Sequence, residues 1–418
     1  MKTCSHLKHI TAYLLCTAIF LGGLNCAGIG LVSEKYPEAF YTVPRVQPII
    51  STESDVTFLV YSDNQAGWRV KEVFYKGWSL NNWRLLLFPF YELYVIGNGL
   101  VGAVNWLRHS PDYGAAERLM VRDAIYDEAT RVPADFILNV GDISAHDGRR
   151  PAHWALFLRE NKIEHPLLNE IPYLPVIGNH EKANDTTYAF PNFQSVFDYP
   201  RFYTVECGSA LLIVLDSNLI IDQYQYIDDE VQEALFQEWF VAEDPENDPS
   251  WLERQLSSTE KPLKIVAMHN PPISFGRHHT DWLEPGSGRD LLQKRRRLIQ
   301  LFDRYNVQVV FSGHDHLYQH SIVRYDQNRE THFIVGGGGG TPLRDVPDEG
   351  TRAAYLRHFQ NEGFDVSLQT VAKIYHYCLV RVNADRCSIH VVQVTGEKDQ
   401  PTRSVEQIEI KIAMENEG

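Results

Sequence analysis

The chain has 418 residues, of which 44% are hydrophobic and 12% aromatic, and its formal net charge is −15. This length and composition allow a large buried core in one big domain or two ordinary ones, and they exclude a collagen-like or disordered chain. The negative charge argues against a general nucleic-acid binder and against a basic surface for anionic membranes, although metal charge can still attract an anionic substrate.

The N-terminal residues 1–28 have the pattern of an export signal. Two lysines precede an uncharged apolar run at 10–24, and small residues end that run. The run is short for a membrane span and typical of a signal peptide, although an uncleaved N-terminal anchor is also compatible with it. Cys26 leaves a lipoprotein open, although the three residues before it match the lipidation pattern poorly. We therefore expect an exported protein that is periplasmic, secreted or membrane-anchored.

Strands and helices alternate after a linker at 29–55. Hydrophobic patterns predict strands at 56–61, 136–140, 173–177, 203–206, 210–216, 263–268, 307–311, 331–335, 375–382 and 387–394. Helices are predicted at 115–129, 154–160, 231–240, 250–257 and 288–306. This order indicates one mixed-sheet α/β domain over 56–396, followed by a polar C-terminal tail at 397–418.

An apolar insertion interrupts this pattern at about 68–113. Its stretches Leu85-Leu86-Leu87-Phe88 and Tyr94-Val95-Ile96 supply more apolar surface than a connecting helix needs. We expect it at the rim of the site, as a lid or subdomain that packs on the domain. The alternative is an apolar surface that contacts a membrane or a lipid-like substrate.

Three smaller features have simple structural interpretations. Cys378 and Cys387, on the predicted C-terminal hairpin, can form a disulfide in an exported protein or remain buried free thiols, like Cys207. The basic run at 294–297 is expected to be a solvated helix face. The glycine run at 336–340 is expected to pack closely at a strand end, because it lacks the Lys-Ser/Thr of a P-loop.

Five short motifs rich in Asp, His and Asn follow predicted strands in chain order. They are Asp63-Asn64-Gln65, Gly141-Asp142, Gly178-Asn179-His180-Glu181, Met268-His269 and Gly313-His314-Asp315-His316. Strand ends that meet at one edge of a sheet gather distant residues into one site. Carboxylate and amide oxygens mixed with imidazoles suit a pair of divalent metals, and such a pair can bind and hydrolyse a phosphate ester. The motifs therefore predict a metal-dependent phosphoesterase.

These ordered motifs resemble those of the calcineurin-like metallophosphoesterases, which include purple acid phosphatases and many phosphodiesterases. The resemblance covers about 56–394, and the five motifs in order are specific although each alone is common. It implies a four-layer α/β/β/α sandwich of two mixed sheets, with a dimetal site at the strand ends. It also implies a small phosphate ester as substrate, and the motifs are shared by monoesterases and diesterases.

The resemblance assigns a set of ligands to two divalent ions, which are manganese, iron, zinc or magnesium. Asp142 bridges both ions; Asp63, Gln65 and His316 complete the first site, and Asn179, His269 and His314 complete the second. Gln65 stands where His is commonest, and its amide oxygen is a weaker ligand that favours manganese or magnesium over zinc. Ala145 stands where purple acid phosphatases have a Tyr, so no ferric–tyrosinate centre is expected.

The predicted catalytic residues are His180 and Asp142. In the family, hydroxide that bridges the metals attacks phosphorus directly, and His180 contacts the phosphate and assists the leaving group. The alternative is a His180 that only orients its neighbours. Weaker candidates for substrate binding are His146, His278 and His279.

Two rival functions use the same fold. One is a non-catalytic, metal-stabilised binding module. The other is a membrane-docked phosphodiesterase that contacts the membrane through its N-terminus or through the apolar insertion.

Overall fold

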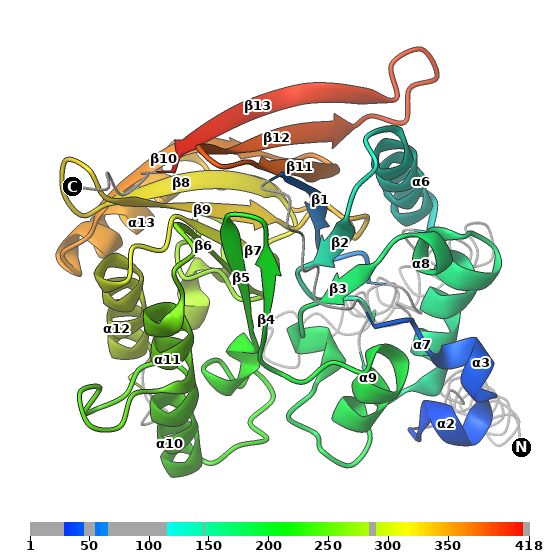
Figure 1. Cartoon of the computed structure of the whole chain (residues 1–418), viewed down its shortest axis with the longest axis horizontal. Coiled ribbons are helices and arrows are strands. Elements are labelled where there is room, and N and C mark those ends of the chain that lie inside the picture. Colours follow the sequence, from blue (N-terminus) through cyan, green and yellow to red (C-terminus); the bar gives the residue numbers. More distant parts are fainter. Residues whose placement is uncertain (1–28, 46–54, 66–114, 145–146, 284–289, 413–418) are drawn as a thin grey trace, which may run out of the picture.

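The computed structural model describes residues 29–45, 55–65, 115–144, 147–283 and 290–412 (Figure 1). The predicted export signal, the apolar insertion, Ala145 and His146 lie outside these residues. The strands are β1 (Val56–Tyr61), β2 (Phe136–Asn139), β3 (Tyr173–Pro175), β4 (Tyr203–Cys207), β5 (Ala210–Leu215), β6 (Leu263–Met268), β7 (Val309–Ser312), β8 (Tyr318–Arg324), β9 (Glu330–Gly336), β10 (Asp365–Ala372), β11 (His376–Val382), β12 (Arg386–Val394) and β13 (Thr402–Lys411).

Two mixed sheets carry the described part of the chain. One sheet has six strands in the order β13-β12-β11-β1-β2-β3, and the other has seven in the order β10-β8-β9-β7-β6-β5-β4. In the first, β1, β2 and β3 are parallel; in the second, β5, β6, β7 and β9 are parallel. Hairpin partners such as β11 and β12 are antiparallel. The predicted α/β fold with two mixed sheets is confirmed.

Helices flank the sheets (Figure 1). They are α2 (Val32–Lys35), α3 (Glu38–Tyr41), α6 (Ala115–Arg131), α7 (Pro151–Leu158), α8 (Leu167–Glu170), α9 (Ala189–Phe197), α10 (Asp229–Trp239), α11 (Trp251–Ser258), α12 (Leu291–Arg304) and α13 (Glu349–Asn361). Ser250 caps α11, because its Oγ accepts from the Glu253 amide at 3.1 Å while Glu253 accepts from the Ser250 amide at 2.9 Å.

The central strands of the seven-stranded sheet are buried on both faces. In β5, Leu212 and Val214 belong to a core that also contains Phe58 of β1. The intervening Ile213 belongs to a second core, with Phe236 of α10. Because successive side chains of a strand point to opposite faces, a sheet covered on both faces needs continuous apolar strands. This explains the unbroken apolar runs that precede the motifs.

Part of the predicted linker packs on the domain. Val32 and Val43 are buried in the first core. Asn192 of α9 accepts a hydrogen bond from the Val32 amide at 2.8 Å and donates one to the Gly30 carbonyl at 3.0 Å. Residues 30–45 therefore belong to the folded unit, because their apolar side chains and backbone groups find partners there.

The predicted polar tail at 397–418 is wrong for much of its length. Residues 402–411 form β13, which pairs antiparallel with β12 at the edge of the six-stranded sheet. Ile408 and Ile410 are buried, whereas Glu409 and Lys411 are exposed. This alternation has the period of a half-buried strand and is present in the sequence itself.

The basic run at 294–297 is a solvated face only in part, because Arg296 is exposed whereas Lys294 and Arg295 are buried. Lys294 pairs with Glu233 at 3.1 Å and Arg295 pairs with Glu362. Their long apolar stems can be buried because each charged head keeps an acidic partner.

The three cysteines of the described residues are buried free thiols. In the β11–β12 ladder Cys378 lies opposite Val391, and Cys387 lies opposite Val382. This register separates the two thiols along the hairpin, so the alternative of buried free thiols is the one found.

The glycine run at 336–340 joins the ends of β9 and β1. The Gly339 amide donates to the Ser62 carbonyl at 2.9 Å, and the Ser62 amide donates to the Gly336 carbonyl at 3.2 Å. A Cβ on Gly339 would overlap the Ser62 carbonyl, so only glycine fits. The run therefore serves close backbone packing, and it holds the residue before Asp63 in place.

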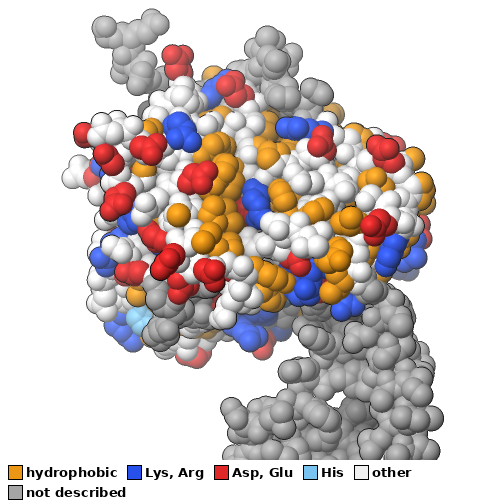
Figure 2. Space-filling model, turned by 90° about the horizontal axis from the view of Figure 1, so that it is seen from below, with side chains coloured by type: hydrophobic (Ala, Val, Ile, Leu, Met, Phe, Trp, Pro, Cys, Tyr) orange, Lys and Arg blue, Asp and Glu red, His pale blue; other side chains and the backbone are white. Residues whose placement is uncertain are grey.

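The face seen from below in Figure 1 carries a stripe of hydrophobic side chains (Figure 2). On this side α9 and α10 border a groove of about 630 Å³, whose walls include Phe190, Phe202, Leu235 and Trp239. Among the described residues, no helix is both long enough and apolar enough to span a membrane.

Candidate metal centre

The predicted ligands lie in tight turns directly after parallel strands. Asp63 follows β1, Asp142 follows β2 and His314 follows β7. Asp63, Asp142 and His314 have φ angles of 60°, 56° and 70°, and Gln65 has 43°. Non-glycine residues rarely adopt this region, and such strain concentrates at functional sites. It is held by neighbouring turns, because the Asp63 amide donates to the Gly141 carbonyl at 3.0 Å and the Gln65 amide to the Asp142 carbonyl at 2.9 Å.

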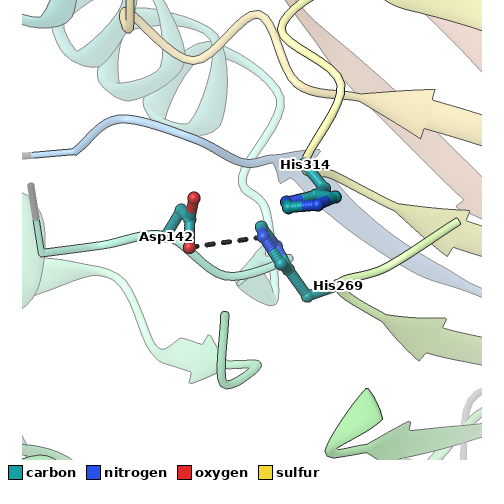
Figure 3. Close-up of side chains that lie close together, drawn as sticks. All are labelled: Asp142, His269 and His314. Atoms are coloured by element: carbon teal, nitrogen blue, oxygen red, sulfur yellow. Dashed lines mark ion pairs between the residues drawn. The ribbon is translucent and has the colours of Figure 1, made fainter. Parts of the chain in front are cut away.

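One cluster joins Asp142, His269 and His314 (Figure 3). Each residue offers one ligand atom, and these atoms lie within 4.8 Å of one another. The Asp142 Oδ1 and His269 Nε2 atoms are 3.3 Å apart. Asn179 lies beside them, with its Oδ1 2.9 Å from His269 Nε2. The structure therefore brings the four residues predicted for the second metal together.

A second cluster joins Asp63, Asp142 and His316, again within 4.8 Å. Gln65 Nε2 lies 3.0 Å from Asp142 Oδ2 and 3.2 Å from His316 Nε2, while its Oε1 accepts from the Thr341 hydroxyl at 3.0 Å. Ligation needs the amide oxygen to face the cluster. A half-turn of the amide achieves this, because the Thr341 hydroxyl can accept as well as donate.

Backbone carbonyls set the tautomers of two histidines. His269 Nδ1 lies 2.8 Å from the Val140 carbonyl, and His316 Nδ1 lies 3.1 Å from the Pro342 carbonyl. A carbonyl only accepts, so each Nδ1 carries the proton. When the rings are neutral, as metal ligation requires, the Nε2 lone pairs face the clusters.

The donor set fits two divalent cations that share Asp142. All these side chains are buried, and Asp63 Oδ1 has no hydrogen-bond partner among the described residues. Burial raises the pKa of Asp63 to about 7. Burial also opposes ionisation of Asp142, but His180 and His269 hold the pKa of that carboxyl well below its usual range. Buried carboxylates of this kind are stabilised by pairing or by metal coordination.

His180 lies at the open side of the clusters. Its backbone amide donates to Asp142 Oδ1 at 2.9 Å, and its Nε2 lies 3.6 Å from Asp142 Oδ2. The ring is 19% exposed, so a ligand can reach it. This position suits proton exchange with a bound ester.

The other two substrate candidates diverge. The His278 ring lies beside the clusters, with its centroid 3.7 Å from the centroid of the His314 ring. His279 is buried instead against Tyr355 and His358 of α13, with ring centroids 3.9 Å apart in the first pair. Burial lowers the pKa of His279 to about 4. His279 therefore faces away from the clusters, because adjacent residues of this turn point to different sides.

Glu181 joins the loops that carry Asp142 and Asn179. Its carboxylate accepts from the Asp142 amide at 2.9 Å, the Gly178 amide at 2.7 Å and the Ser144 amide at 2.7 Å. Burial raises its pKa to about 7.

Three residues beside the clusters were not predicted from the sequence. Asp281 Oδ2 lies 2.8 Å from His314 Nε2, Gln223 Oε1 accepts from Asn179 Nδ2 at 2.6 Å, and Arg344 Nη1 lies 2.6 Å from His278 Nε2. Asp281 had one usable signal, its spacing of three residues from His278. Gln223 and Arg344 had none, because they lie in loops that carry no motif.

The family model "Calcineurin-like phosphoesterase" matches residues 57–318. The chain is 29% identical over 203 residues to Fe(3+)-Zn(2+) purple acid phosphatase 12 of Arabidopsis thaliana. The aligned region covers 44% of this chain and 37% of that protein. It is 28% identical over 235 residues to purple acid phosphatase 1 of Ipomoea batatas. This aligned region covers 49% of the present chain and 44% of the relative. The matches thus span less than half of these relatives' lengths.

Solved structures show the same fold. The yellow lupin purple acid phosphatase PPD1 has a TM-score of 0.51 at 14% identity, covering 86% of this chain and 54% of that one. GAP50, the anchor in the inner membrane complex of Plasmodium, has a TM-score of 0.51 at 11% identity. The match covers 87% of this chain and 91% of the GAP50 chain. Together with the family match and the His/Asp clusters, these similarities establish that the chain belongs to the calcineurin-like phosphoesterase family, as a distant homologue of the purple acid phosphatases.

Proposed function

We propose that this protein hydrolyses phosphate esters at a centre of two divalent cations. The cations would be held by Asp63, Gln65, Asp142, Asn179, His269, His314 and His316. The observation that carries the proposal is that Asp142 belongs to both His/Asp clusters. A carboxylate shared in this way can bridge two cations, which is the arrangement that a dimetal hydrolase needs.

Two divalent cations bound by these residues would supply hydroxide at neutral pH and would offset the charge that develops on the phosphoryl oxygens. The chain contributes rigid ligands, because Glu181 and the glycine run fix the turns that carry them. His180, whose ring is partly exposed beside the buried Asp142, would exchange a proton with the leaving oxygen.

The test is hydrolysis of a chromogenic phosphomonoester and of its bis-ester analogue. Metal-stripped protein is re-supplied with manganese, iron, zinc or magnesium, alongside Asp142→Asn and the exposed control Asp345→Asn. We expect metal-dependent turnover that Asp142→Asn loses and Asp345→Asn keeps. The ratio of the two rates then distinguishes a monoesterase from a diesterase.

Turnover that persists in Asp142→Asn, or that needs no metal, would contradict the proposal. Two tightly bound equivalents of metal without turnover on either ester would favour the binding-module alternative.

We also propose export through residues 1–28 and, as a subsidiary function, membrane contact through the N-terminus or the apolar insertion. Fractionation of cells that express the full chain, and flotation with liposomes, test these two points.

A further inference from the structure

A chain of four side chains extends from the cluster of Asp142, His269 and His314 to Arg344. His314 Nε2 lies 2.8 Å from Asp281 Oδ2, and His278 Nδ1 lies 2.8 Å from the same oxygen. Arg344 Nη1 lies 2.6 Å from His278 Nε2. The two imidazoles therefore converge on one carboxylate oxygen, and the centroids of their rings are 3.7 Å apart.

The donors and acceptors of this chain can be assigned in one way. An Arg guanidinium only donates, so His278 Nε2 accepts and, in the neutral ring, His278 Nδ1 carries the proton. That N–H donates to the Asp281 carboxylate. The same oxygen accepts from His314, so the proton of the neutral His314 ring is on Nε2. The remaining nitrogen of His314, Nδ1, is left with its lone pair.

The turn that presents Asp281 is rigid. Asp281 and His278 lie three residues apart in the 3₁₀ helix Arg277–Trp282, so they share a face. The buried Trp282 donates from Nε1 to the Pro271 carbonyl at 2.8 Å, and Asp315 accepts from the His278 amide at 3.1 Å. Asp315 lies between His314 and His316, so the ligand loop and the Asp281 turn hold each other.

We propose that Asp281 is a positioning residue, which holds His314 in the Nε2–H tautomer so that Nδ1 is its ligand atom. This inference rests on the proposed dimetal function. Carboxylates that accept from a ligand histidine orient the ring, and their removal typically weakens metal affinity by about 10–100-fold. His269 and His316 receive the same support from backbone carbonyls, whereas His314 obtains it from a side chain and can therefore be tested by substitution.

The experiment is a manganese titration of the metal-stripped full chain and of three variants. Asp281→Leu removes the acceptor at similar size. Asp281→Asn also removes the charge, but its amide oxygen can occupy the place of Oδ2 and accept from His314. Asp345→Leu is the control, because Asp345 is exposed and, among the described residues, forms an ion pair only with the half-exposed Lys373.

We expect the wild type to bind two equivalents of manganese. Asp281→Leu should weaken the affinity for one of them by about 10–100-fold. Asp281→Asn and Asp345→Leu should stay within a few-fold of the wild type. Equal weakening in Asp281→Leu and Asp281→Asn would overturn the inference, because charge alone would then explain the effect. A third equivalent that Asp281→Leu abolishes would also overturn it, since His278, Asp281 and His314 would then form a cation site of their own.

A second measurement keeps the inference testable if Asp281→Leu does not fold. Nitrogen-15 NMR of the metal-free wild type, labelled at histidine and assigned with His314→Asn, reports the tautomer directly. The Nε2–H form supports the inference, and the Nδ1–H form overturns it. A wild type that binds no manganese refutes the proposed function instead, and the tautomer measurement still decides the role of Asp281.

Discussion

Acid should destabilise the protein through His376, a fully buried residue of β11 beside the glycine run. Burial lowers its pKa from 6.5 to about 4, although a hydrogen bond with the Ile374 carbonyl at 3.2 Å opposes this. In the unfolded chain the ring titrates near the ordinary value. Between about pH 6.5 and 4 the unfolded state therefore binds a proton that the folded state does not. The free energy of unfolding falls as the pH falls through this window, and the loss is complete below about 4.

A pKa difference of this size corresponds to about 3 kcal/mol, of which about 2 kcal/mol is lost between pH 7 and pH 4.5. His376→Leu removes the titrating ring at similar volume. In urea unfolding of the metal-free chain, we expect the wild type to lose about 2 kcal/mol more than this variant between the two pH values. Burial also lowers the pKa values of His153 and His332 to about 4. Both residues remain in the variant, so their contributions to the pH dependence cancel when the two proteins are compared. Equal losses in the two proteins would refute the reasoning.

Three further predictions concern the site and its support. His180→Gln should lower kcat by about 100-fold or more while two metals still bind, because the His180 backbone amide that donates to Asp142 Oδ1 is kept; kinetics with metal titration checks this. Gly339→Ala should displace the turn before Asp63 and weaken one metal equivalent, whereas Gly350→Ala in α13 should not; the same titration compares them. Asn192→Leu leaves the Val32 amide and the Gly30 carbonyl without their side-chain partner, at about 1–3 kcal/mol each, so limited proteolysis should cut within 30–45 faster than in the wild type.

The elements that sequence patterns revealed are those with a regular apolar period. The helix at 115–129 and the strand at 263–268 are observed as α6 and β6 with nearly the predicted bounds. β8 was missed because it buries Gln319, His320 and Ser321, and a strand with polar buried side chains has no hydrophobic signature. α13 was missed for a related reason, since Phe359 is its one fully buried residue. β13 was overlooked although its alternation is plain.

The sequence by itself predicted the class of chemistry. Oxygen and imidazole donors placed directly after apolar strands favour hard and borderline metals, and that information is local. The order of the motifs also identified the family. Metal binding by the seven predicted ligands stays a prediction, although the structure brings their side chains together.

Only the tertiary structure decided how those donors are arranged. It brings Asp142 into both clusters, turns His279 away, and places Asp281 against His314 across a separation of 33 residues. It also pairs β13 with β12 and seats residues 30–45 on the domain. These outcomes depend on contacts between distant segments, because sheet order and side-chain hydrogen bonds are set by which surfaces meet. A hydrophobic period records only that a face is buried, and not what covers it.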